Sequence, residues 1–244
     1  MSKRVRVPLS GLEPGERLLE EKTAHYLRDV LRLRAGETFV VFDPDTRLEA
    51  DARLAESSDG TYAGIGALRS VTRGSGSGIV LVQALGKGDK TEQVVRSATA
   101  LGVAELHLVE SARSVARVGE RADAKRARLE AIALDASRQS GRADVPKIVG
   151  PHPLELELHA SKDVPAIKVC LVPGALRSLR SLTADWSLGS PISILVGPEG
   201  GLSDAELAAA EAVGFVPASF GELVLRTEIA GIAALGALLL IGHS

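Results

Sequence analysis

Residues 192–206 read Ile-Ser-Ile-Leu-Val-Gly-Pro-Glu-Gly-Gly-Leu-Ser-Asp-Ala-Glu. A short apolar run is followed by a glycine-rich loop, and the pair Ser203 and Glu206 has the spacing of a capping box, which marks the start of a helix. The stretch therefore predicts a buried strand, a tight loop and a helix that begins near residue 203.

The loop of this stretch has the composition of a ligand-binding turn. Gly197, Gly200 and Gly201 allow the backbone to approach a ligand closely and to adopt positive φ, while Pro198 stiffens the loop and Glu199 places a carboxylate at its tip. A carboxylate would repel a phosphate, so a phosphate ligand is a poor fit. From these residues alone, the loop could also be a simple turn.

Beyond residue 78, apolar strand-like runs alternate with helical patterns. Strands are predicted at 79–84, 105–109, 168–172 and 192–196, and helices at 90–101, 122–140, 203–213 and 227–241. This alternation indicates an α/β domain with a mainly parallel sheet, whose ligands bind at the carboxyl ends of the strands.

The first seventy residues have a different pattern, with short extended segments at 4–8, 38–43, 47–54 and 61–68. One helix is predicted at 22–33, and the strand spacing is typical of a small β-barrel. Residues 73–78 (Arg-Gly-Ser-Gly-Ser-Gly) read as a linker. We therefore predict two domains, 1–72 and 79–244.

Length and composition favour a globular protein with a substantial core, since 45% of the 244 residues are hydrophobic. The longest apolar run, 229–241, is shorter than the ~20 residues that span a bilayer. No signal peptide is apparent, so we expect a cytoplasmic protein without membrane association. The single cysteine, Cys170, lies in an apolar run and is expected to be buried.

Charge is unevenly distributed along the chain, although the net charge is only −2. Residues 1–34 carry eight basic and five acidic side chains, and residues 113–147 carry nine and five. Such basic segments suit a polyanion such as nucleic acid, but they could also be ordinary solvated faces.

Several enzyme classes lack their required motifs in this chain. It has no P-loop, dinucleotide fingerprint, zincin helix, nucleophile elbow or Cys-x-x-Cys pair. Of the five histidines, only His152 and His159 are near each other, in a proline-rich connection, so no metal site is expected.

A second loop, 220–230, reads Phe-Gly-Glu-Leu-Val-Leu-Arg-Thr-Glu-Ile-Ala and leads into the last predicted helix. Thr227 is a candidate cap, and Glu228 lies at the positive end of the helix. Arg226 is either a functional cation or a partner of Glu228 or Glu222. The helix is apolar almost all round, so it should be buried, with a second subunit as one candidate for its cover.

The segments Val-Gly-Pro-Glu-Gly-Gly-Leu-Ser-x-x-Glu (196–206) and Val-Leu-Arg-Thr-Glu (224–228) resemble the RsmE family, 16S ribosomal RNA uracil-N3 methyltransferases of the SPOUT superfamily. Further matches are found at His25, Val30–Arg32, Lys87–Glu92, Thr99–Val103, Arg113–Val115, Ser137–Arg142 and Pro146. Departures occur at Ala100, Leu223 and Ile229. The one at Leu223 replaces an arginine of the family, which leaves Arg226 as the only cationic side chain of that loop.

The resemblance implies a PUA-like β-barrel followed by an α/β domain tied in a trefoil knot, with S-adenosylmethionine as cofactor. It implies cofactor binding by Leu171, Val172, Pro173, Gly197, Glu199, Gly200, Gly201, Leu223, Leu225, Arg226 and Thr227. Backbone groups and leucine side chains suit an adenine, and a sulfonium is a cation that Glu199 tolerates.

For the reaction, the resemblance implies methylation of N3 of a specific uridine in 16S rRNA of the small ribosomal subunit, by a homodimer. We expect Arg226 to stabilise the uracil anion and Glu199 or Glu228 to relay the proton, with no choice between the two carboxylates. The arginines expected to bind RNA are Arg4, Arg6, Arg28, Arg32, Arg113, Arg117, Arg138 and Arg142. Stacking is limited to Tyr26, Tyr62, Phe39 and Phe42, because aromatic residues make up only 3% of the chain.

Two other functions compete with this one. A SPOUT enzyme could methylate another RNA position, such as a ribose 2′-hydroxyl, or the chain could be a non-catalytic RNA-binding protein with a relic of the cofactor site. The intact loops at 197–201 and 225–228 argue against the relic.

Overall fold

A computed structural model describes residues 5–71, 78–114 and 122–242. By its internal contacts the chain divides into two compact units: Met1–Ser75 with Ser137–Val145, and Gly76–Ala136 with Pro146–Ser244. Most of the predicted linker, together with Arg4 and Arg117, lies outside the described residues.

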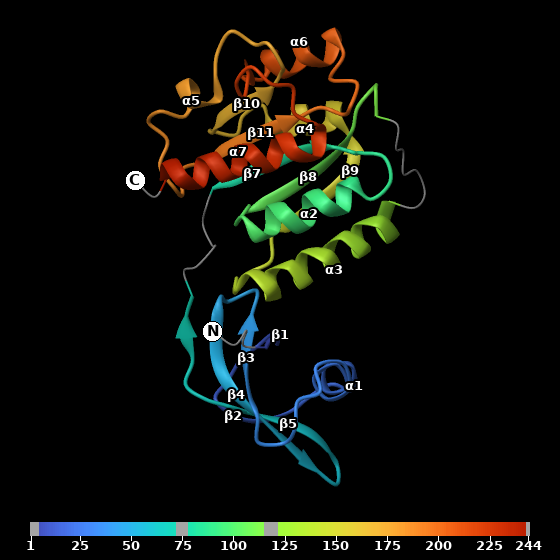
Figure 1. Cartoon of the computed structure of the whole chain (residues 1–244), viewed down its shortest axis with the longest axis vertical. Helices are drawn as coiled ribbons and strands as arrows, with labels where there is room; N and C mark the ends of the chain where they lie inside the picture. The colour runs from blue at the N-terminus through green and yellow to red at the C-terminus, as the bar shows by residue number, and fades with distance from the viewer. Residues whose placement is uncertain (1–4, 72–77, 115–121, 243–244) are drawn as a thin grey trace. The chain divides into compact units, whose positions relative to one another are not determined.

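The first unit is built on a six-stranded sheet with the order β1-β3-β4-β5-β2, and β6 pairs with β4 (Figure 1). Its strands are β1 (Arg6–Pro8), β2 (Gly15–Leu18), β3 (Thr38–Asp43), β4 (Leu48–Ser57), β5 (Gly60–Ile65) and β6 (Arg69–Ser70). β1 and β3 are parallel, whereas the other pairs are antiparallel. The predicted extended segments are thus confirmed as strands, but β2 and β6 were not predicted.

The predicted helix of this unit is shorter and less regular than expected. It consists of α1 (Glu21–His25) and a π-helical segment, η1 (Tyr26–Val30). Arg32 adopts a positive φ of 57°, a left-handed conformation that a right-handed helix cannot continue through. The helix therefore ends at Val30 and not at Leu33.

The second unit contains a six-stranded sheet with the order β12-β10-β11-β7-β8-β9, in which every pair is parallel. Its strands are β7 (Ile79–Ala84), β8 (Glu105–Glu110), β9 (Lys147–Pro153), β10 (Ile167–Leu171), β11 (Ile192–Val196) and β12 (Val216–Ala218). The predicted α/β class with a parallel sheet is confirmed. The carboxyl ends of β12, β10, β11 and β7 are neighbours, which brings the loops after these strands together at one edge.

Helices cover both faces of this sheet: α2 (Lys90–Ala100), α3 (Ala122–Ser140), α4 (Leu154–Ser161), α5 (Leu179–Leu182), α6 (Asp204–Ala212) and α7 (Thr227–Gly242). The period of two along β7 assigns its side chains to opposite faces. Val82 packs in a cluster with Leu158 of α4 and Ala210 of α6, while Leu81 lies against Gly231 of α7. Figure 1 shows α7 and α2 lying side by side over the sheet.

One sequence prediction about burial is confirmed in this unit. Cys170 is fully buried, and burial raises the pKa of its thiol to about 12. Among the described helices, none combines the length and the apolar character needed to cross a membrane.

Candidate functional site

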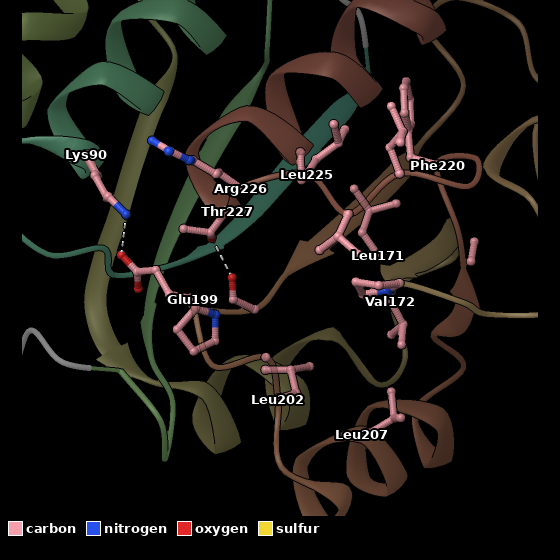
Figure 2. A pocket seen from close by; sticks show the side chains of 18 residues that line it. Lys90, Leu171, Val172, Glu199, Leu202, Leu207, Phe220, Leu225, Arg226 and Thr227 are labelled. Atoms are coloured by element: carbon pink, nitrogen blue, oxygen red, sulfur yellow. Dashed lines mark hydrogen bonds and ion pairs between the residues drawn. The ribbon is translucent and has the colours of Figure 1, made fainter.

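A cavity of about 480 Å³ lies at the carboxyl edge of the parallel sheet (Figure 2). It is lined by Lys90, Leu171, Val172, Pro173, Gly197, Pro198, Glu199, Gly201, Leu202, Leu207, Ala218, Phe220, Leu223, Val224, Leu225, Arg226, Thr227 and Ala230. These residues follow β7, β10, β11 and β12, which are adjacent strands. The cavity therefore lies where ligands bind in open parallel sheets.

The loop after β11 has its shape because of two glycines. Gly201 adopts a φ of +68°, which a residue with a side chain rarely adopts, and its N–H donates to the carbonyl of Pro198 at 2.9 Å. A Cβ at Gly197 would lie 3.1 Å from the backbone nitrogen of Leu202. The loop therefore folds tightly and exposes its backbone to the cavity.

The predicted capping box after this loop is confirmed. The side chain of Ser203 accepts from the N–H of Glu206, and Oε2 of Glu206 accepts from the N–H of Ser203 at 2.8 Å. Oε1 of Glu206 accepts from the N–H of Ala112 at 2.7 Å, which joins the loop after β8 to α6. Burial acts to raise the pKa of Glu206, but these backbone donors outweigh it, so the pKa is lowered.

Thr227 connects the two loops that were discussed as candidate binding loops from the sequence, 197–201 and 220–230. Its hydroxyl donates to the carbonyl of Gly197 at 2.6 Å and accepts from Nε2 of Gln83 at 3.0 Å. The N–H groups of Ile229 and Ala230 donate instead to the carbonyl of Arg226. The expected capping role of Thr227 is thus replaced by a cross-link between loops.

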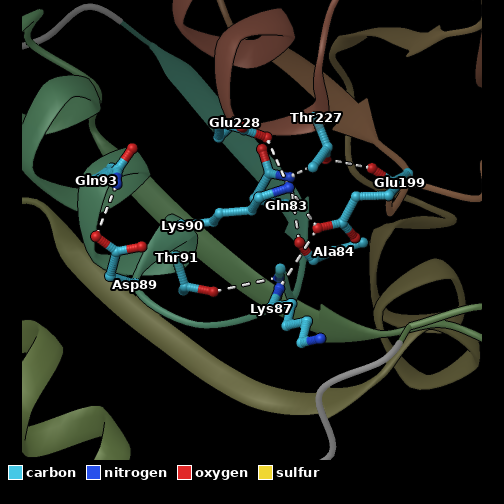
Figure 3. A network of polar contacts seen from close by, with 12 residues as sticks. Gln83, Ala84, Lys87, Asp89, Lys90, Thr91, Gln93, Glu199, Thr227 and Glu228 are labelled. Atoms are coloured by element: carbon cyan, nitrogen blue, oxygen red, sulfur yellow. Dashed lines mark hydrogen bonds and ion pairs between the residues drawn. The ribbon is translucent and has the colours of Figure 1, made fainter.

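Lys90, in the first turn of α2, lies between two carboxylates (Figure 3). Its Nζ is 2.8 Å from Oε1 of Glu199 and 3.4 Å from Oε2 of Glu228. The hydrogen bond from Lys90 holds the pKa of Glu199 below its usual value, and the same bond raises the pKa of Lys90. Glu199 lines the cavity. Glu228 does not line it but contacts Lys90, which does.

Arg226 lines the same cavity with an exposed side chain. Within the described ranges 5–71, 78–114 and 122–242, no acidic side chain forms an ion pair with it. The alternative in which it pairs with Glu222 or Glu228 is therefore not observed, because Glu228 faces Lys90 instead.

Ten of the eleven residues expected to bind cofactor line this one cavity. Gly200 does not line it; a Cβ there would lie 3.4 Å from the side chain of Arg113. Arg113 in turn donates to the carbonyls of Gly200 and Leu202 at 3.0 and 3.2 Å, so it supports the loop from behind.

Several lining residues, above all Lys90, were not predicted from the sequence as site residues. One signal was available, because a lysine in the first turn of a helix opposes the helix dipole and suggests an acidic partner. Finding that partner requires the strand order, which places β7 beside β11. No sequence pattern marks the apolar residues Leu202, Leu207 and Phe220 as part of the cavity.

The arginines expected to bind RNA fall into different environments. Arg6 lies over the ring of Phe42, pairs with Glu49 at 2.8 Å and donates to the carbonyl of Arg142. Arg142 is 3% exposed and pairs with Asp144 at 2.9 Å. Both guanidinium groups are largely buried as well as paired, so neither is assigned to RNA binding.

Other predicted RNA contacts remain at least partly accessible. Arg32 and Arg113 are exposed, Arg28 is half-buried and Arg138 lies over the ring of Tyr26 at 4.9 Å. Phe39 and Phe42, considered for base stacking, are buried in the core of the first unit. The two phenylalanines therefore cannot stack on a base in this conformation.

The histidines are arranged differently from the expectation. Glu157 accepts hydrogen bonds from two imidazoles, from Nδ1 of His107 at 2.7 Å and from Nε2 of His152 at 2.9 Å. His152 lies in β9, not in a connection, and its partner is Glu157 rather than His159. In the part of the chain that the structure describes, no group of three or more acidic, histidine or cysteine side chains is arranged to hold a metal ion.

The fold and the cavity define a parallel α/β protein with a ligand site at the carboxyl edge of its sheet. Comparison with known proteins identifies its family. The family model of the RNA methyltransferase domain matches residues 75–239. A ribosomal RNA small subunit methyltransferase E of Mycobacterium bovis is 33% identical over 217 residues, which are 85% of this chain and 80% of the relative. The chain therefore belongs to the ribosomal RNA small subunit methyltransferase E family.

Solved structures give the same result for the fold. A protein from Legionella pneumophila described as a methyltransferase, in complex with S-adenosylmethionine, is 28% identical with a TM-score of 0.86 over 97% of both chains. A ribosomal RNA small subunit methyltransferase E from Neisseria gonorrhoeae, also bound to S-adenosylmethionine, is 27% identical with a TM-score of 0.85 over 98% of both chains.

Proposed function

We propose that the protein transfers a methyl group from S-adenosylmethionine to N3 of a specific uridine in 16S rRNA of the small ribosomal subunit. The observation that carries this proposal is the single cavity that joins the three loops expected to bind the cofactor. Family membership supports the rRNA substrate and the cofactor, and the resemblance in the two loops supports the N3 position.

The cavity has the chemistry that this cofactor requires. Its apolar wall, formed by Leu171, Val172 and Leu225, suits an adenine ring, and the backbone of Gly197 and Gly201 offers hydrogen bonds without side chains in the way. Lys90 and Glu199 form a charged wall for an amino acid group. When bound, the cofactor supplies an electrophilic methyl group.

Two side chains of the cavity are assigned to the chemistry at the uracil base. N3 of uracil is a weak acid, so the attacking base must lose its proton and carry negative charge. Arg226 presents an exposed guanidinium at the cavity and is assigned to stabilise that charge. Of the two candidate carboxylates, Glu199 lines the cavity and is assigned to accept the proton.

For RNA binding we assign Arg28, Arg32, Arg113 and Arg138, whose guanidinium groups remain at least partly accessible. Contacts of this kind bind phosphates and make affinity fall as salt rises. We further propose that the first sheet closes as a PUA-like barrel, that 73–78 links two domains and that the second domain is knotted. An experimental electron-density map that traces an open sheet or an unthreaded chain would exclude these features.

We also propose that the protein acts in the cytoplasm as a homodimer. Leu223 and Val224, beside the cavity, are 79% and 75% exposed, and Leu240 on α7 is 78% exposed. Exposed apolar side chains that lie together, such as those of the neighbours Leu223 and Val224, are candidates for an interface. A monomer mass in sedimentation equilibrium at micromolar concentration would contradict the dimer.

The proposed function is tested by incubating small ribosomal subunits that lack the modification with the protein and methyl-labelled S-adenosylmethionine. The RNA is then digested to nucleosides. We expect the label in 3-methyluridine. Label in a 2′-O-methylated nucleoside would instead support the other SPOUT activity, and no transfer to subunits or to free rRNA would support a non-catalytic RNA-binding protein.

A further inference from the structure

Three elements that are distant in sequence contribute one charged cluster beside the cavity (Figure 3). Lys90 comes from the start of α2, Glu199 from the loop after β11 and Glu228 from the first turn of α7. Nζ of Lys90 is 2.8 Å from Glu199 and 3.4 Å from Glu228, and the N–H of Lys87 adds a long contact of 3.5 Å to Glu199.

The position of Lys90 is unfavourable for the helix itself, since the first turn of a helix favours negative charge. The two carboxylates compensate for this cost. The side chain of Glu228 is 11% exposed, and those of Lys90 and Glu199 are 29% and 32% exposed, so solvent screens the cluster only in part. One ammonium and two carboxylates leave a net charge of −1.

The charges of Lys90 and Glu199 within the cluster are stable around neutral pH. The hydrogen bond to Glu199 raises the pKa of Lys90, and the same bond lowers the pKa of Glu199. Both groups therefore keep their charges where an enzyme of this family would work.

The cavity has two unlike walls, as Figure 2 shows. Leucine, valine and phenylalanine side chains line one side, and Lys90, Glu199 and Arg226 line the other. A ligand whose adenine occupies the apolar side must direct its methionine part toward the charged side. The ammonium and carboxylate groups of that part keep their charges during methyl transfer, whereas the sulfur loses its positive charge.

We propose that the Lys90–Glu199–Glu228 cluster makes the cavity bind the sulfonium cofactor more tightly than its neutral thioether product. The inference rests on the proposed function and assigns a role in cofactor exchange to the cluster. When the N3–carbon bond forms and the sulfur–carbon bond breaks, the sulfur takes the bonding electron pair and loses its positive charge, while the N3 proton passes to Glu199 and on to water, which restores the charge of the cluster. The attraction to the cluster then falls, which favours exchange of product for fresh cofactor.

Two further cations lie near the cluster, and neither cancels its charge by contact. Arg226 lines the cavity but is exposed, and it is assigned above to the RNA base. Lys87 contributes its main-chain N–H to Glu199, while its side chain is exposed. Water screens both charges more than those of the cluster.

The test is the ratio of the dissociation constants of S-adenosylhomocysteine and S-adenosylmethionine, measured by calorimetry without RNA. The ratio cancels losses that affect both ligands alike. Glu199→Gln makes the cluster neutral and should lower the ratio about three- to tenfold, as expected for one partly screened charge. Lys90→Met leaves two carboxylates and should raise the ratio by a similar factor. Glu228→Gln should lower it.

Control variants remove one negative or one positive charge at positions away from the cavity. Glu92 pairs with Arg128 at 2.8 Å, and Arg96 lies 4.0 Å from Asp135. Glu92→Gln and Arg96→Met should leave the ratio unchanged, because the variants alter only the overall charge of the protein.

Three outcomes would overturn the inference. The ratio stays constant in all variants, it moves in the same direction in Lys90→Met and Glu199→Gln, or the wild type binds the two ligands equally. In each case methyl transfer by the wild type would leave the proposed function standing. If the wild type bound neither ligand and transferred no methyl group to RNA, the proposed function would fail together with the inference.

Discussion

The hydroxyl of Thr227 donates a 2.6 Å hydrogen bond to the carbonyl of Gly197, thirty residues earlier in the chain. This bond joins the start of α7 to the glycine loop after β11, and both segments line the cavity. Thr227 is 7% exposed, so water cannot easily replace it as a donor. The geometry of the cavity therefore depends on this contact.

Thr227→Val should weaken the binding of S-adenosylmethionine by about fivefold to thirtyfold. The substitution keeps the shape of the side chain but leaves a buried carbonyl without its donor, which costs about 1–2 kcal/mol. Calorimetric titration measures the effect. Thr227→Ser, which keeps the hydroxyl, should bind nearly as the wild type does, and equal affinities for the Val and Ser variants would refute the role of the bond.

Arg226→Ala should lower the rate of methyl transfer to RNA by about 10²–10³, as the loss of a group that stabilises developing charge does. Affinity for S-adenosylmethionine should fall much less than the rate, because Arg226 lines the cavity with an exposed guanidinium that is unpaired with any described acidic side chain. Single-turnover kinetics and calorimetry separate the two effects. Arg180→Ala, an exposed arginine on α5, is the control. A variant that loses cofactor binding and rate equally would place Arg226 in the cofactor site instead.

Glu157→Gln should destabilise the protein most between about pH 4.5 and 6.5. Burial alone would raise the pKa of Glu157, but the bonds to His107 and His152 lower it to about 2. This stabilisation is present above pH 4.5 and is lost as the pH falls toward 2. The pKa of His107 is raised from 6.5, since its bonds to Glu157 and Glu105 outweigh burial, and that contribution is lost as the pH rises above this range.

Urea unfolding at several pH values measures this dependence, with an expected loss of about 3 kcal/mol at the maximum. Glu155→Gln, an exposed residue on the same helix, should have little effect at any pH. A loss in Glu157→Gln that is independent of pH from 3 to 9 would show that packing, and not charge, explains the role of Glu157.

Arg142→Ala should destabilise the first unit by about 3 kcal/mol or more, because it leaves Asp144 without its buried counter-charge. The double variant Arg142→Met with Asp144→Leu should lose less stability than the single one. Binding of rRNA by the folded double variant should be close to normal. A large loss of RNA affinity without loss of stability would restore the RNA-binding role first expected of Arg142.

Local sequence signals were sufficient for the centre of the site. The capping box at Ser203 and the glycines at 197 and 201 determine the loop after β11 whatever the rest of the fold does. Equally, the alternation of apolar strands and helices determines the parallel sheet. Elements with weak local patterns were missed: β9 contains Gly150 and Pro151, and β12 has three residues around Pro217, which the edge of a sheet tolerates.

Contacts between distant segments were beyond the reach of the sequence. Arg6 and Arg142 were expected to bind RNA because of the family resemblance and their basic segments, yet both are paired within the first unit. Conversely, the role of Lys90 depends on β7 lying beside β11, which no local pattern encodes. The burial of a charged residue is a property of the tertiary structure. An arginine-rich segment is therefore weaker evidence for a binding site than a loop with defined backbone geometry.

The most direct test of the central claim is a calorimetric titration of S-adenosylmethionine into the wild type and two glycine variants. Gly197→Ala would place a Cβ 3.1 Å from the backbone of Leu202, in the wall of the cavity, whereas Gly64→Ala, in β5, would meet only an ordinary contact at 3.8 Å. We predict that the wild type and Gly64→Ala bind alike and that Gly197→Ala binds at least tenfold more weakly. Equal binding by all three proteins would contradict the assignment of this cavity as the cofactor site.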